Sequence, residues 1–171
     1  EFQKALAIRP NEFAAHLALG AAYRDTGQLE PALKHFTEAA RVNRDVEAGH
    51  LSRAVVLLRL NRLDEAIQAY GEVLRINPAN DGVRTALGVT LASQGKVDRA
   101  ITQFAEAVRI NPDNARAYLG LGYALLEKQR FDAANEQFVE ALRIRPRDPL
   151  ARDGMQKVEE ARRKAAAERA R

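Results

Sequence analysis

Histidine and acidic side chains are the groups in this 171-residue chain that could do chemistry. The histidines are His16, His35 and His50, and no two of them have the spacing of zinc ligands on one helix turn. The chain has no cysteine, which excludes a disulfide, a thiolate zinc site and a cysteine nucleophile. We therefore expect the histidines to have structural roles, with no metal and no cofactor.

The acidic residues also lack a catalytic arrangement. Asp64 and Glu65 fall at an expected helix start, where negative charge complements the helix dipole. No Ser, His and Asp set and no phosphate-cradling glycine loop occurs. The sequence predicts that this chain is not an enzyme.

The composition narrows the function classes further. The 27 basic and 23 acidic residues give a formal charge of +4, and they alternate along the chain without forming a basic block. We therefore expect no nucleic-acid partner. No apolar run approaches the roughly 18 to 20 residues that span a bilayer. The composition does not decide whether the protein is located in the cytoplasm or the periplasm. The 21 arginines against 6 lysines favour a bacterial source.

A 34-residue period organises the whole chain. The prolines Pro78, Pro112 and Pro146 follow one another at this spacing, and Pro10 precedes Pro78 by two periods, with Arg44 at the missing step. The same period aligns residues of one kind in three columns. Two columns hold small residues, namely Gly20, Ala54, Gly88 and Gly122 in the first and Ala32, Ala66, Ala100 and Ala134 in the second. The third column is aromatic and holds Phe36, Tyr70, Phe104 and Phe138. Small residues recur where two helices must touch, and the aromatic ring fills the remaining space.

These columns resemble the tetratricopeptide repeat. The resemblance implies an all-α, right-handed superhelical solenoid of antiparallel helix pairs, in which each pair stacks on its neighbours to bury its apolar face. We expect one array over residues 1–171, with a second-helix remnant at 1–10, full repeats at 13–46, 47–80, 81–114 and 115–148, and a capping helix with a basic tail at 149–171. The first residues are therefore expected to continue a repeat that begins upstream of Glu1.

The turns inside and between repeats also follow from the residues. Gly27, Asn61 and Gly95 can take the left-handed conformation that ends a helix, whereas Gln129 would be strained there. The segment 110–114, which contains Pro112, is expected to close a second helix and to supply a cap for the next helix.

In the family, the first helix of each repeat lines a concave groove, and this implies a partner-binding surface here. The matching positions are unusually apolar, which is typical of a site for an amphipathic helix or an extended apolar segment of a protein partner. They are Leu17, Ala21, Arg24, Leu51, Val55, Leu58, Arg59, Thr85, Val89, Arg116, Leu119, Tyr123 and Leu126.

The family's chaperone-docking clamp for a C-terminal carboxylate does not fit these positions. It would need charged or amide groups at Leu17, Ala21, Ser52, Gly82 and Ala86. Starting one repeat later, only Arg116 is suitable. The chaperone-clamp function is therefore set aside.

The residues thus predict a non-catalytic interaction scaffold, and two alternatives stay open. The chain could be an accessory or regulatory region of a larger bacterial enzyme or envelope assembly protein, for polysaccharide or pilus, or it could associate with itself. Arg53 stands where other repeats have Leu19, Leu87 and Leu121, and Arg44 replaces a proline. We predict that the junction of the first two repeats is the least stable, which amide exchange would test.

Overall fold

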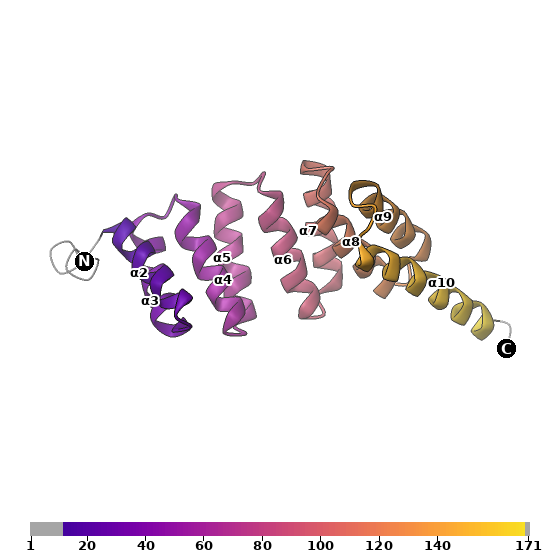
Figure 1. The fold of residues 1–171 in the computed structure, drawn as a ribbon, viewed down its shortest axis with the longest axis horizontal. Helices are drawn as coiled ribbons and strands as arrows, with labels where there is room; N and C mark the ends of the chain where they lie inside the picture. The colour runs from indigo at the N-terminus through magenta and orange to yellow at the C-terminus, as the bar shows by residue number, and fades with distance from the viewer. Residues whose placement is uncertain (1–11, 170–171) are drawn as a thin grey trace. The chain divides into compact units, whose positions relative to one another are not determined.

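The computed structural model describes residues 12–169, and the regular elements in that range are all α-helices (Figure 1). They are α2 Phe13–Asp25, α3 Leu29–Val42, α4 Glu47–Arg59, α5 Leu63–Ile76, α6 Asp81–Ser93, α7 Val97–Ile110, α8 Ala115–Glu127, α9 Phe131–Ile144 and α10 Pro149–Arg169. The expected all-α fold is thus confirmed for this part of the chain. The second-helix remnant expected at 1–10 lies outside the described residues.

The chain divides into two compact units, Glu1–Pro78 and Ala79–Arg171. Helices α2–α5 belong to the first unit and α6–α10 to the second (Figure 1). Within each unit every helix packs on the next, and alternate helices also touch, α2 on α4 in the first and α6 on α8 and α8 on α10 in the second. We call α2, α4, α6 and α8 the first helices, and α3, α5, α7 and α9 the second helices.

The small-residue and aromatic columns form the core of each helix pair. The four alanines at the start of the second helices are completely buried, and the aromatic rings one turn later are at most 2% exposed. Apolar burial at this spacing makes each second helix amphipathic and holds it against its first helix. The core members are Ala32, Ala66, Ala100, Ala134, Phe36, Tyr70, Phe104 and Phe138.

Phe104 shows why the facing positions must be small. A Cβ atom added to Gly88 of α6 would lie 2.7 Å from the Phe104 ring, and one added to Gly120 of α8 would also overlap it. The ring therefore lies between two glycines on two different helices. Phe138 repeats this arrangement between Gly122 and Gly154.

Each first helix ends at a residue in the left-handed region. After α6, the N–H of Lys96 donates to the carbonyl of Leu91 at 2.9 Å and that of Gly95 to Ala92 at 2.9 Å. This pattern satisfies the last carbonyls of the helix and needs a positive φ between them. The structure confirms the four predicted positions, with φ values of 77°, 56°, 71° and 57° at Gly27, Asn61, Gly95 and Gln129.

Asparagine side chains cap α6 and α8, the two first helices of the second unit. The side-chain oxygen of Asn114 accepts from the N–H of Ala117 at 3.0 Å, which confirms that the segment 110–114 supplies a cap for α8. Asn80 accepts in the same way from Val83 at the start of α6. Because the first N–H groups of a helix have no partner inside it, these caps fix where α6 and α8 begin.

Helix α10 continues the second unit by packing on α8 and α9. Its buried side is formed by Ala151, Gly154 and Val158, while Glu159 and Glu160 are exposed. The helix thus covers the end of the last repeat with one face and presents charged groups on the other.

Candidate partner-binding surface

In the first unit, the predicted surface residues lie on α2 and α4 and differ in exposure. Leu17, Ala21 and Arg24 of α2 are half-buried, as are Leu51 and Leu58 of α4. Val55 is 38% exposed, and Arg59 is also exposed. Leu51, Val55 and Leu58 recur at helical spacing, so they share one stripe of α4. An aliphatic stripe with an exposed centre therefore runs along α4.

The structure brings two predicted arginines together in this unit. The Arg59 guanidinium donates to the backbone carbonyl of Arg24 at 3.4 Å, which joins the C-terminal ends of α2 and α4. Cations at these ends complement the helix dipoles. The two residues therefore define the end of the apolar stripe in the first unit.

In the second unit, the predicted residues on α6 and α8 fall into two groups. Val89 is 40% exposed, Arg116 is exposed and Leu126 is half-buried. Thr85 and Leu119 are only 3% and 8% exposed, so their side chains serve packing. Thr85 donates to the carbonyl of Asp81 at 2.8 Å and accepts from the Asn114 amide at 3.0 Å.

Tyr123 anchors α10 to α8. Its hydroxyl donates to the carbonyl of Leu150 at 2.8 Å and lies 3.0 Å from a carboxylate oxygen of Asp153, which also pairs with Lys157 at 2.7 Å. Burial, followed by the hydrogen bond to Asp153, raises the pKa of Tyr123 to about 12. The tyrosine thus has a structural function in addition to any contact with a partner.

A polar network that sequence reasoning missed joins α6 to the turn before α8. The amides of Asn111 and Asn114 donate to the same oxygen of Asp81 at 3.0 and 2.6 Å. Their spacing of 30 and 33 residues from Asp81 follows the repeat period, and that period is the signal that could have revealed the contact. The network holds α6 and α8 in place and so positions Val89 and Arg116.

Two of the three histidines meet in the first unit. The Nδ1 atoms of His16 and His35 are 3.1 Å apart, so one ring donates to the other. The His35 ring also stacks on Tyr23, with centroids 5.5 Å apart and planes 8° apart. Among residues 12–169, no group of three or more histidine, cysteine, aspartate or glutamate side chains could hold a metal ion.

None of the helices in residues 12–169 is both long and apolar enough to cross a bilayer. No curated protein matches the chain in sequence.

Several solved structures have a similar fold. A crystal structure of MamA is 24% identical, with 85% of each chain covered and a TM-score of 0.80. A tetratricopeptide repeat protein from Parabacteroides merdae is 22% identical, with 99% of this chain and 67% of its own covered and a TM-score of 0.81. The first TPR of Spaghetti (RPAP3), bound to the HSP90 peptide SRMEEVD, is 21% identical, with 67% and 91% covered and a TM-score of 0.65.

Family models agree with this likeness in fold. A model described as tetratricopeptide repeat matches residues 17–81 and 85–149, and a second model of the same description matches residues 57–107. The first of these covers well over half of the chain. Proteins built from this repeat are generally non-catalytic scaffolds that bind protein or peptide partners. This chain belongs to the tetratricopeptide repeat family.

Proposed function

We propose that this chain is a non-catalytic protein–protein interaction scaffold, and that its first helices bind a helical or extended apolar segment of a partner. Its repeat family supports the general role, and the similar Spaghetti domain is bound to a peptide. The residues on the first helices support the chemistry of the partner.

The observation that carries this proposal is the exposure of aliphatic side chains on the first helices. Val55 and Val89 occupy the same repeat position, one in each unit, and are 38% and 40% exposed. On α4, the half-buried Leu51 and Leu58 lie on the same stripe as Val55. Exposed aliphatic groups that line up on a folded surface are typical of a site that another protein covers. An amphipathic helix would present matching side chains at intervals of three and four residues.

The residues at the clamp positions support an apolar partner over a charged C-terminus. Leu17 and Ala21 on α2 have no charge and no amide with which to bind a carboxylate. Thr85, the polar member of the predicted set on α6, uses its hydroxyl within its own unit. Binding is therefore expected to depend mainly on burial of apolar area.

A pull-down from lysate with the 171-residue chain and single variants tests the proposal. Val55→Glu in the first unit and Val89→Glu in the second each place a charge at the exposed aliphatic position of a first helix, where a bound apolar segment would have to bury it. We expect a protein retained by the wild type to be lost with either variant. Mass spectrometry identifies the retained proteins, and circular dichroism checks that helical content is unchanged.

Val139→Glu is the matched control, because Val139 is 46% exposed but lies on the second helix α9. It should retain the same protein as the wild type. Retention by all three variants would exclude the first helices as the site. Loss with all three would indicate capture by general hydrophobicity.

A further inference from the structure

A cavity of about 510 Å³ opens in the first unit between α3, α4 and α5, away from the proposed partner surface. On α4, Leu51, Val55 and Leu58 share one stripe, and at 3.6 residues per turn His50 and Arg53 face the other side of the helix. The cavity wall is rich in cations and contains one carboxylate. Its lining residues are Thr37, Ala40, Arg41, Arg44, His50, Arg53, Glu72 and Arg75.

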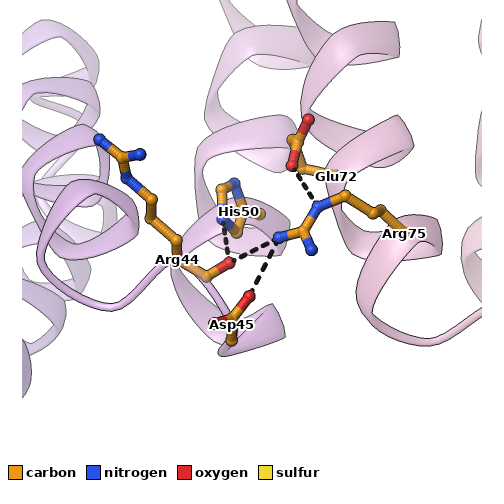
Figure 2. A network of polar contacts seen from close by, with 5 residues as sticks. All are labelled: Arg44, Asp45, His50, Glu72 and Arg75. Carbon is orange, nitrogen blue, oxygen red and sulfur yellow. Dashed lines mark hydrogen bonds and ion pairs between the residues drawn. The ribbon is translucent and has the colours of Figure 1, made fainter.

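Hydrogen bonds around the Arg44 carbonyl hold one side of this cavity (Figure 2). His50 donates through Nε2 to that carbonyl at 3.1 Å, and Arg75 donates to it at 3.2 Å. Arg75 also pairs with Asp45 at 3.2 Å and with Glu72 at 3.0 Å. In Figure 2 the side chain of Arg44 points away from Asp45, while its backbone carbonyl faces His50 and Arg75. The turn between α3 and α4 is thereby fixed to α5.

Two of the four arginines have no ion-pair partner in the part of the chain that the structure describes. Arg75 has Glu72 and Asp45, and Arg41 has Glu38 at 2.8 Å. No carboxylate in residues 12–169 forms an ion pair with Arg44 or Arg53.

Glu65, an acid whose pKa the charge of Arg53 helps to lower, is already paired with another arginine. A hydrogen bond from Arg62 is the main cause that lowers the pKa of Glu65, and the charges of Arg62 and then Arg53 add to it. The Arg62 and Glu65 side chains form two hydrogen bonds, at 2.6 and 2.8 Å. The positive charge of Arg53 therefore faces the cavity without a counterion of its own.

Both arginines are departures from the repeat pattern. The positions equivalent to Arg53 hold Leu19, Leu87 and Leu121, which are 9%, 7% and 7% exposed, whereas Arg53 is a half-buried cation. Arg44 stands where the later repeats have proline. A charge at a position that packs apolar groups elsewhere costs stability unless something pairs with it. Arg53 is such a change, and Arg44, the second departure from the pattern, lines the same cavity.

His50 adds an unpaired polar atom to the same wall. It is 6% exposed, and its Nε2 donates to the Arg44 carbonyl, which leaves Nδ1 as the second ring nitrogen. That Nδ1 is buried and has no hydrogen-bond partner. Buried polar atoms are normally satisfied, so this nitrogen is an exception beside the cavity.

We propose that this cavity binds a phosphate group carried by a small phosphorylated molecule or side chain. The two unpaired guanidiniums of Arg44 and Arg53 match the double negative charge of a phosphate, whereas a carboxylate would neutralise only one. Guanidinium forks suit phosphate oxygens because they donate two parallel hydrogen bonds. The volume also leaves room for the group to which the phosphate is attached. This inference does not rest on the proposed partner surface.

Titration of the 171-residue chain with inorganic phosphate, followed by calorimetry and by amide chemical shifts, tests the proposal. Arg53→Leu and Arg44→Pro each restore the residue of the other repeats, so both variants should fold at least as well as the wild type. We expect each to weaken phosphate binding by about tenfold, because each removes one charge-assisted contact. Arg109→Gln is the control, since Arg109 has the repeat position of Arg41 and Arg75 but lies in the second unit and pairs with Glu106 at 2.9 Å.

The source of the phosphate is distinguished with a phosphoserine peptide beside the same peptide carrying serine. Tighter binding of the phosphopeptide than of inorganic phosphate would assign the cavity to a phosphorylated side chain, and equal binding would assign it to small phosphates. The proposal is overturned if sodium chloride at equal ionic strength reproduces the phosphate titration. It is also overturned if Arg53→Leu and Arg44→Pro bind like the wild type, or if Arg109→Gln loses binding equally.

Discussion

Gln129, in the turn between α8 and α9, has a φ of 57°, a conformation that disfavours side chains with a Cβ. Gln129→Gly should therefore raise the free energy of unfolding by about 0.5–1 kcal/mol, even after the extra entropy that glycine has in the unfolded chain. Urea denaturation followed by circular dichroism measures the change. The matched control is Asn61→Gly at φ 56°, where the gain should be smaller because asparagine tolerates this region better. Equal gains would mean that the cost is not specific to glutamine.

The pair formed by His16 and His35 should make stability depend on pH. Burial first, and then the charges of His16 and Lys34, lower the pKa of His35 from 6.5, and Glu38 opposes them. The unfolded chain therefore takes up a proton at a higher pH than the folded chain does. The contribution of His35 to stability is present above about pH 6.5 and is lost as the pH falls below it.

Urea denaturation at pH 7.5 and pH 5.5 measures this loss. When both rings carry a proton at Nδ1, as they do once both are protonated, two N–H groups face each other across the 3.1 Å contact between these atoms. His35→Phe keeps a ring beside Tyr23 but cannot be protonated, so its stability should fall less between the two pH values. An equal fall in wild type and variant would assign the dependence to other groups.

At the scale of helices, close approach through glycine holds the pairs together, and Gly88→Ala tests it. The added Cβ would lie 2.7 Å from the Phe104 ring, and the ring has little room to move because it also lies close to Gly120. We expect a loss of about 1–3 kcal/mol in the free energy of unfolding. Gly71→Ala in α5 is the control, because nothing lies within 4 Å of its added Cβ. That control should gain about 0.5–1 kcal/mol from helix propensity.

The helices and their core could be predicted from the sequence because each depends on local spacing. The columns of alanine and aromatic residues and the left-handed turns repeat every 34 residues, so one copy supports the next. The roles of Thr85 and Tyr123 could not be predicted in this way. Thr85 meets Asn114 and Tyr123 meets Asp153, and each contact depends on which side chains two successive repeats happen to bring together.

The cavity lined by Arg44 and Arg53 could also be predicted only in part from the sequence. The sequence marked both residues as departures from the pattern and predicted a weak junction there. It did not indicate that His50 and Arg75 share the Arg44 carbonyl, because that contact joins a backbone atom to side chains of two helices. Departures from a repeat thus locate a site, and the packing of three helices decides what its residues can bind.

At the scale of the molecule, a repeat array is stable only where its last apolar face is covered, and α10 covers that of the second unit. A chain that stops at residue 148 loses the buried Ala151, Gly154 and Val158 and leaves Phe138 open on one side. We expect its urea midpoint to fall and light scattering to show association that grows with concentration. A chain that stops at residue 163 keeps these contacts, as well as the ion pair of Arg162 with Asp132, and should behave as the full chain. If both truncated chains lost stability to the same extent, the stabilising effect of α10 would depend on its charged end and not on its buried face.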